Sequence, residues 1–460
     1  MRDPELYAEF TLSGVWWLPE RPSEKRPGTL SVKGGSDISL ELFGLLDGLA
    51  DADRTGLTKF PIILGTSERG EPCTLFDNTA AAYHGQEPVM SKVFVNRLYL
   101  GKHFADAASV RFKSVRVGFT NLEEWLGWSP FEFSHGTETS EISLHIPSPY
   151  RKHFEFHEPT RAAALSAWSM MTETSGRSRF GAEFNAHIEL APAGPSEFEW
   201  FYEVVFDVRN LLTLFVGSPV YVEMMLGQGD DIEYAPGVRR PEDIGIYFPI
   251  KRWPQRESVR RFEMPVTFQT IEGQASEVLG AWFSNAQKLR LVCELFFGAQ
   301  YNDEMYVDSK FVNFTQALEI FHRVMWDGRH VPPEIYDVYR EGLLAAIPRE
   351  VPERLRQRFQ NGINQANMYS LQDRLSDLIA RLDPWTQDKI LKGEESFARR
   401  VALTRNYLTH GGESLRAKAL STPWEYFRAN QKLRTILSLH MLKMLGIPER
   451  QVAPALLRQM

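Results

Sequence analysis

The sequence predicts an α+β protein in two parts: a β-rich N-terminal sandwich or partly open barrel, followed by an all-α helical bundle. Three observations lead to this prediction. Up to about residue 270, apolar residues mainly alternate with polar ones, as they do in strands. Most of the glycines and prolines, which mark turns, lie in the same part. Past residue 270 the apolar residues follow a helical period instead.

The N-terminal part, residues 1–270, contains many short candidate strands separated by turn signals. They cover residues 29–32, 38–42, 93–95, 115–119, 184–190, 221–225, 244–248 and 264–268. One helix is predicted among them, at residues 199–214, where five apolar residues form a stripe. Short strands with frequent turns favour a sandwich or barrel over a parallel doubly wound sheet.

The C-terminal part, residues 275–460, is predicted to contain only helices. They cover residues 275–297, 312–326, 333–346, 353–382, 394–410 and 423–445, and the fourth is expected to be interrupted. Prolines and the pair Gly411-Gly412 separate them. This length is sufficient for a bundle with its own core.

Composition excludes several classes of protein. The chain has 460 residues, of which 43% are hydrophobic and 24% charged, so extended disorder and a collagen-like fold are excluded. No apolar run approaches the roughly 18 to 20 residues needed to span a bilayer. The N-terminus lacks the apolar core of a secretion signal, and two distant cysteines form no disulfide framework. We therefore expect a cytoplasmic protein that does not enter a membrane.

Charge is divided unevenly along the chain. The net charge is −7, but residues 396–460 hold eleven Lys and Arg against three Asp and Glu, a balance of +8. Residues 1–395 therefore carry −15. A basic C-terminal segment can attract a polyanion. Solvated helix faces also carry many lysines and arginines, so charge alone leaves both interpretations open.

The candidate site is the hexapeptide that runs from Arg405 to His410. On a helix, Asn406 and His410 share a face and can form a hydrogen bond, whereas Arg405 lies about 140° around the axis from His410. Gly411 is placed to cap the C-terminal end of this helix, where a positive charge is favoured. The alternative is a helix-end histidine and a surface arginine that share no task.

This combination of side chains suits RNA cleavage without a metal. That reaction needs a base for the 2′-hydroxyl, an acid for the leaving 5′-oxygen and a cation on the phosphate. Histidine can act as base or acid near neutral pH, and arginine binds phosphate oxygens. Since one helix supplies one histidine, two copies of the chain meeting across a twofold axis would supply both roles.

An all-α C-terminal domain with Arg405-Asn406 and His410 near the end of a late helix resembles the HEPN superfamily, over roughly residues 275–446. The order of parts resembles the ApeA-like antiphage proteins, which join a β-rich N-terminal domain to a HEPN domain. The segments 13–19, 28–30 and 40–44 are similar to the start of that N-terminal domain.

The resemblance implies a metal-independent endoribonuclease that acts in abortive infection and is regulated by its N-terminal domain. It implies Arg405 and His410 as catalytic residues and Asn406 as the supporting polar residue. Glu319, which lies three residues from His322 on an earlier helix, is a candidate acidic contributor, although such a pair is more often a surface contact. Expected partners are RNA, such as tRNA or another cellular RNA, a second copy in a homodimer or higher even oligomer, and a phage-derived trigger. No cofactor and no metal are expected.

Two rival functions stay open. A non-catalytic HEPN-like module could bind a nucleotide or a protein partner. A carbohydrate-acting β-domain could use Glu123 and Glu124 beside Trp125 as an aromatic platform. A weaker signal is His153, Glu155 and His157, which share one face of a strand and could hold a metal, or simply form its polar outer face.

Overall fold

The computed structural model of the protein describes residues 5–34, 36–46, 57–83, 90–128, 132–135, 142–145, 151–156, 163–176, 179–250 and 258–460. The chain forms two compact units. The first consists of Met1–Leu212, Val220–Arg261 and Thr267–Gly280. The second consists of Thr213–Pro219, Phe262–Val266 and Ala281–Met460. The described strands lie in the first unit, and most helices lie in the second.

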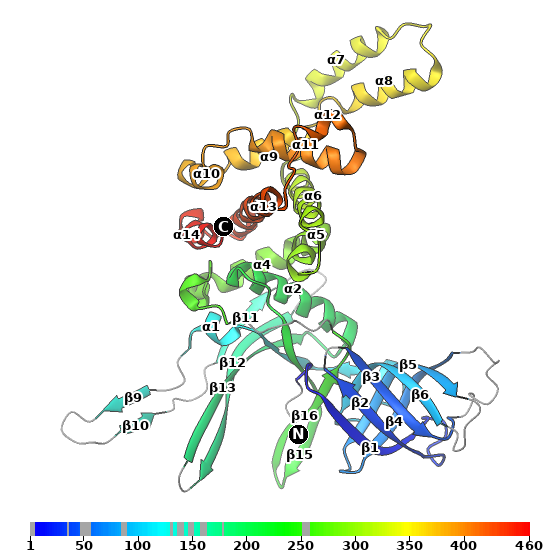
Figure 1. Ribbon diagram of the computed structural model, residues 1–460. Helices are drawn as coiled ribbons and strands as arrows, with labels where there is room; N and C mark the ends of the chain where they lie inside the picture. Colours follow the sequence, from blue (N-terminus) through cyan, green and yellow to red (C-terminus); the bar gives the residue numbers. More distant parts are fainter. Residues whose placement is uncertain are drawn as a thin grey trace. The chain divides into compact units, whose positions relative to one another are not determined.

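Six antiparallel strands at the start of the chain close into a barrel (Figure 1). They are β1 (Phe10–Trp17), β2 (Arg26–Lys33), β3 (Asp37–Phe43), β4 (Thr58–Ser67), β5 (Pro72–Tyr83) and β6 (Met90–Leu100). They pair in the order β6-β3-β2-β1-β4-β5, and β5 then pairs with β6. Because this last pairing closes the ring, the predicted sandwich or partly open barrel is a closed barrel with extra strands.

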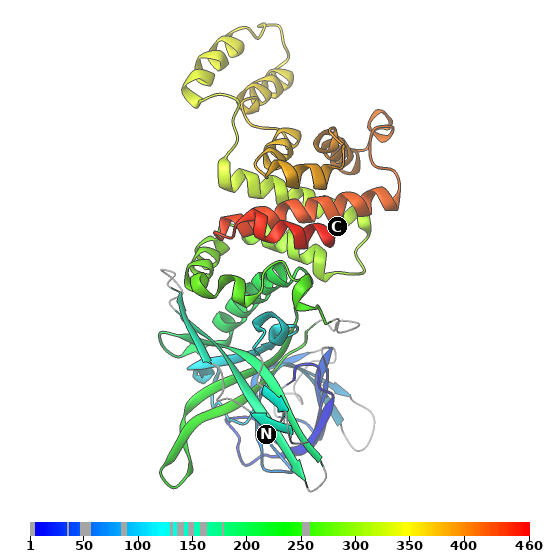
Figure 2. The same cartoon turned by 90° about the vertical axis from the view of Figure 1, so that its left-hand side faces the viewer.

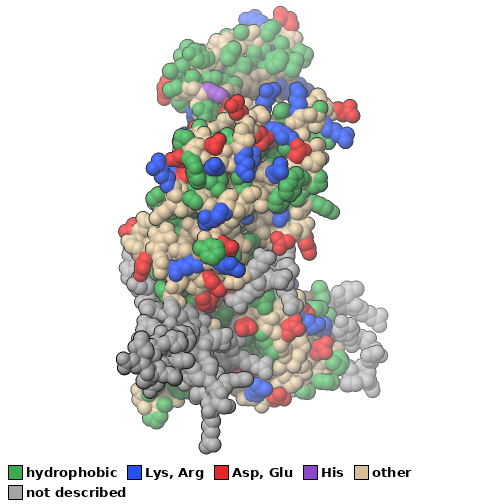
Figure 3. All heavy atoms as spheres, turned by 60° about the vertical axis from the view of Figure 1, so that its left-hand side comes forward, with side chains coloured by type: hydrophobic (Ala, Val, Ile, Leu, Met, Phe, Trp, Pro, Cys, Tyr) green, Lys and Arg blue, Asp and Glu red, His purple; other side chains and the backbone are tan. Residues whose placement is uncertain are grey.

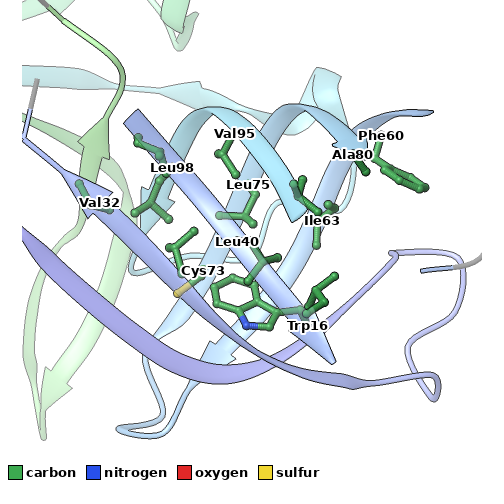
Figure 4. Packing of buried hydrophobic residues seen from close by; sticks show 14 of the residues in the cluster. Trp16, Val32, Leu40, Phe60, Ile63, Cys73, Leu75, Ala80, Val95 and Leu98 are labelled. Atoms are coloured by element: carbon green, nitrogen blue, oxygen red, sulfur yellow. The ribbon is translucent and has the colours of Figure 1, made fainter. Parts of the chain in front are cut away.

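Apolar side chains fill the interior of this barrel (Figure 4). Trp16 is fully buried and lies close to Leu40 and Cys73 in the view of Figure 4. Gly65 of β4 lies directly against the indole, because a Cβ atom at that position would approach the Trp16 ring to 2.1 Å. The large ring thus fits only beside a residue without a side chain. The alternation seen in the sequence therefore corresponds to a packed barrel core.

Further strands extend the sheet from β6. They follow in the order β16 (Val238–Tyr247), β15 (Val222–Ala235), β8 (Ser114–Phe119), β13 (Arg179–Pro192), β12 (Ala163–Gly176) and β11 (Arg151–Phe156). Two small sheets pair β7 (Arg111–Phe112) with β14 (Ser196–Glu197) and β9 (Glu132–His135) with β10 (Ile142–His145). Helix α1 (Leu122–Leu126) and the predicted helix α2 (Phe198–Val216) accompany them, and the predicted apolar stripe of α2 is buried.

The rest of the chain is helical. Its helices are α3 (Phe268–Ile271), α4 (Ala275–Ala286), α5 (Arg290–Tyr301), α6 (Val307–Trp326), α7 (Pro333–Ala345), α8 (Glu353–Gln365), α9 (Leu371–Ala380), α10 (Pro384–Leu391), α11 (Phe397–His410), α12 (Glu413–Arg416), α13 (Pro423–Met444) and α14 (Glu449–Arg458). Helix α6 is central to the second unit, because it packs against α5, α9, α11 and α13. Within the residues that the structure describes, no helix is long and apolar enough to cross a bilayer.

Several predicted elements differ from the observed ones. Residues 264–268 form no strand: Pro265 offers no N–H to a ladder, although Met264 and Val266 are buried as alternation suggests. The helix predicted at residues 275–297 is broken between α4 and α5. The helix predicted at residues 394–410 begins at Phe397, after a left-handed turn at Lys392 and Gly393. Helices α10 and α14, each begun next to a proline, were not predicted.

A buried histidine makes the stability of the helical unit depend on pH. His440 on α13 is 4% exposed, and its Nε2 lies 2.9 Å from the carbonyl oxygen of Leu378 on α9. Burial lowers the pKa of His440 to about 4 from its ordinary value of 6.5. Between these two pH values, His440 is therefore protonated in the unfolded chain but neutral in the folded chain. The contribution of neutral His440 to the free energy of unfolding is complete above pH 6.5 and is lost as the pH falls toward 4.

From this shift we expect the free energy of unfolding of the helical unit to fall by about 2 kcal/mol between pH 7 and pH 5. Chemical denaturation across this range measures the slope. The control is His440→Gln, which cannot titrate at this position and should reduce the slope, while His322 of α6, whose pKa burial also lowers, keeps part of it. An equal slope in both proteins would contradict this account of His440.

Candidate functional site

Helix α11 carries the hexapeptide that the sequence singles out. Its apolar stripe faces the core, since Phe397, Val401 and Thr404 are buried. The helix ends at His410. The N–H of Gly411 donates to the carbonyl oxygen of Tyr407, and Gly411 has a positive φ of 71°. Gly411 therefore caps the C-terminal end, as its position predicts.

Thr404 anchors this helix to the segment before α13. Its hydroxyl donates to the carbonyl oxygen of Arg400 at 2.8 Å and accepts the N–H of Leu420 at 2.9 Å. Both contacts are shielded from water, because Thr404 is fully buried. These two hydrogen bonds therefore hold the residue that precedes Arg405 in place.

Arg405 is held by Glu319 of α6. Its Nη2 lies 3.5 Å from one carboxylate oxygen of Glu319, whose other oxygen lies 3.1 Å from Nη2 of Arg323. The Arg405 and Glu319 side chains are only 29% and 21% exposed, so water screens this pair less than a surface pair. The Nε atom of Arg405 is buried and makes no hydrogen bond. The carboxylate of Glu319 therefore positions this arginine, whose guanidinium can donate to more than one acceptor.

His410 lies apart from this ion pair. It is exposed in the last turn of α11, and Asn406 one turn earlier is partly buried. Among the described residues, no side-chain hydrogen bond joins His410 to Asn406, and none joins it to Arg405. The expected Asn406–His410 bond is thus not formed in the single chain. The histidine is free to meet a substrate or a second copy of the chain.

His322 serves the core. It is fully buried on α6, with Nδ1 3.0 Å from an Nη atom of Arg374 and Nε2 2.8 Å from Asp377. Since arginine only donates, Nδ1 must accept, and the Nε2 hydrogen goes to Asp377. Burial also lowers the pKa of His322, which favours the same neutral form. Both ring nitrogens are occupied, so this histidine has no free group for proton transfer.

Sequence reasoning did not find Arg374 and Asp377. They lie three residues apart on α9, a spacing that surface pairs also use. Only the burial of Arg374 identifies them as part of a polar network between α6 and α9. Together with Glu319 on the same α6, this network fixes the helix that positions Arg405.

Glu123, Glu124 and Trp125, on which the carbohydrate hypothesis depends, each contact a different part of the protein. An oxygen of Glu123 accepts the N–H of Ala186 at 3.0 Å, and Glu124 accepts the hydroxyl of Ser258 at 3.3 Å. Trp125 is 7% exposed and packs edge-on against Phe268. A buried indole offers no platform for a sugar. This observation removes the residue pattern on which the carbohydrate hypothesis depends.

The candidate metal ligands are His153, Glu155 and His157. His157 and the side chains of His153 and Glu155 lie outside the described residues. Among the residues that are described, no group of histidine, cysteine and carboxylate side chains has the arrangement of a metal site.

Two family models match the chain. Residues 11–282, more than half of the chain, match ApeA N-terminal domain 1, and residues 312–451 match Apea-like HEPN. The chain belongs to the ApeA-like family. The second match contains α11 with Arg405 and His410, together with Glu319 of α6. No curated protein and no solved structure matches this ApeA-like protein. Its helical region is therefore a HEPN domain, a type of domain that is typically a ribonuclease.

Proposed function

We propose that this ApeA-like protein is a metal-independent endoribonuclease of antiphage defence, with Arg405 and His410 as its catalytic residues. The observation that carries the proposal is the ion pair between Arg405 and Glu319, which presents a guanidinium at the C-terminal half of α11 within the HEPN match. An exposed histidine follows on the same helix. Glu319 positions the arginine, and Asn406 supports the histidine when the substrate is bound.

In the proposed reaction, the 2′-oxygen of a ribose attacks the adjacent phosphorus, and the bond from phosphorus to the 5′-oxygen breaks. One His410 removes the proton of the 2′-hydroxyl, and a second His410 donates a proton to the departing 5′-oxygen. Arg405 binds the non-bridging oxygens, where negative charge increases in the transition state. The products are a 2′,3′-cyclic phosphate and a 5′-hydroxyl. Since each chain supplies one His410, the active form is a homodimer or a higher even oligomer.

The biological setting is part of the same proposal. The enzyme acts in the cytoplasm on tRNA or another cellular RNA, and the β-rich unit restrains it until a phage-derived trigger appears. Cleavage of host RNA would then stop growth and interrupt infection. The division of the chain into two compact units supports separate regulatory and catalytic roles.

The test is incubation of the purified full chain with total RNA in the presence of EDTA, followed by analysis of the product ends. The expected result is cleavage that EDTA does not inhibit, with cyclic phosphate and 5′-hydroxyl ends. A matched single-stranded DNA should stay intact because it has no 2′-hydroxyl. If no RNA is cleaved with or without phage lysate, or if products carry 5′-phosphates, the proposed chemistry is wrong.

A further inference from the structure

A cavity of about 580 Å³ lies in the helical unit beside the N-terminal half of α11. Its walls come from the C-terminal end of α10 and the residues after it, from α11, from Leu420, from the first turns of α13 and from Met460. This volume falls in the range of cavities that hold small ligands or parts of larger ones. The residues assigned to catalysis do not line it.

Two aromatic rings at this cavity are exposed. Trp424 and Phe427, in the first turns of α13, are 58% and 42% exposed. Their rings stack in parallel, with centroids 5.3 Å apart and an interplanar angle of 8°. Large apolar rings that stay this accessible contribute little to the core. The exposed parts of this stacked pair offer aromatic surface that a nucleobase can contact.

Among the side chains that line the cavity, four are cations and two are carboxylates. Glu394 is neutralised by Lys432 at 2.7 Å and by Arg400, which also contacts Glu425. Both Glu425 oxygens are already occupied, since they accept bonds from Ser421, Thr422 and Arg400. Hydrogen bonding, first from the backbone of Ser421, lowers the pKa of Glu425 to about 2. The two carboxylates therefore add no unpaired negative charge.

The remaining two cations have no acidic partner. Arg428 lies over the Trp424 ring, 4.9 Å from its centroid, and Lys392 is exposed at the end of α10. Within the described part of the chain, neither makes an ion pair. An accessible stacked pair of rings with unpaired cations beside it is the arrangement that binds a base and its phosphate in single-stranded nucleic acids.

We propose that this cavity is a second contact for the RNA substrate, which binds a nucleobase on Trp424 and Phe427 and a neighbouring phosphate on Arg428 and Lys392. The inference rests on the proposed function for its substrate class. Helix α11 links the two places, since Arg400 lines the cavity and Arg405 and His410 lie five and ten residues later, about 7.5 Å and about 15 Å along an ideal helix. One strand can thus occupy the cavity while a phosphate a few nucleotides away lies at Arg405.

The experiment measures binding separately from cleavage. Full-length His410→Ala protein is titrated into labelled single-stranded RNA in EDTA, and fluorescence anisotropy gives the Kd. Adding Trp424→Ala should raise the Kd about 5- to 150-fold, the effect of one lost stacking contact. Trp424→Phe should restore most of the affinity. The control is Trp385→Ala, which removes another tryptophan, 50% exposed, that does not line the cavity.

A folded Trp424→Ala variant with unchanged Kd would overturn the inference and leave the proposed cleavage intact. A different outcome is that the wild-type protein never cleaves RNA while Trp424→Ala weakens RNA binding. That result would support the RNA contact at the cavity and contradict the proposed ribonuclease activity. Adenosine monophosphate is the second probe, because a free nucleotide has the same chemistry. If it competes with RNA at micromolar concentration, the cavity binds nucleotides and the assignment to substrate RNA is wrong.

Discussion

Replacing His410 by alanine should lower the rate of RNA cleavage about 10²- to 10⁴-fold, the usual contribution of a general acid or base. Both proton transfers of the proposed reaction depend on this imidazole, so the lower end of the range applies only if water replaces it efficiently. His410 is exposed and its side chain makes no hydrogen bond among the described residues, so the substitution should leave folding unchanged.

The measurement is the initial rate of cleavage of a labelled RNA in EDTA at equal protein concentration. Thr409→Ala is the matched control, because Thr409 is the exposed neighbour in the same turn and its hydroxyl only donates to the carbonyl oxygen of Arg405. It should retain nearly full activity. If the two variants have equal rates, His410 is not catalytic.

Replacing Arg405 by alanine should reduce cleavage about 10²- to 10³-fold, since it removes a donor to the charge that forms in the transition state. Arg405→Lys should recover only part of this loss, because an ammonium keeps the charge without the paired N–H donors of a guanidinium. Glu319 keeps its contact with Arg323 in both variants, so its charge is not left unpaired.

Rates at saturating RNA separate a loss of catalysis from a loss of binding. Arg405 is expected to act on the transition state, so kcat should fall more than KM rises. Arg399→Ala, on the same helix but exposed, is the control for the loss of one positive charge. Equal effects of Arg405→Ala and Arg399→Ala would mean that only general electrostatic attraction is lost.

Much of the fold could be predicted from the sequence, because the apolar period changes where strands give way to helices. The closure of the barrel could not, since it depends on the pairing of β5 with β6 through backbone groups that carry no sequence signal. Prolines account for one strand that was predicted but is absent and for one helix that is present but was not predicted. Pro265 ended a run that alternates like a strand, and Pro384 begins a short helix that the spacing did not reveal.

The candidate site was only partly predictable for a similar reason. The spacing of Arg405 and His410 is a property of one helix, but the contact between Arg405 and Glu319 joins two helices that are distant in sequence. Glu319 and His322 lie three residues apart, a spacing that is also common between exposed residues on a helix surface. Burial alone separates them, placing Glu319 at the arginine and His322 in a core network with Arg374 and Asp377.

The central claim is that two copies of His410 complete one active site, and the most direct test is the activity of a heterodimer. Wild-type and His410→Ala chains carrying different tags are co-expressed, and the mixed species is isolated through both tags in turn. The account predicts that this heterodimer cleaves RNA at least about 10²-fold more slowly than the wild-type dimer, because the composite site keeps only one of its two imidazoles. About half of the wild-type rate in the mixed species, or full activity in a protein that stays monomeric, would contradict it.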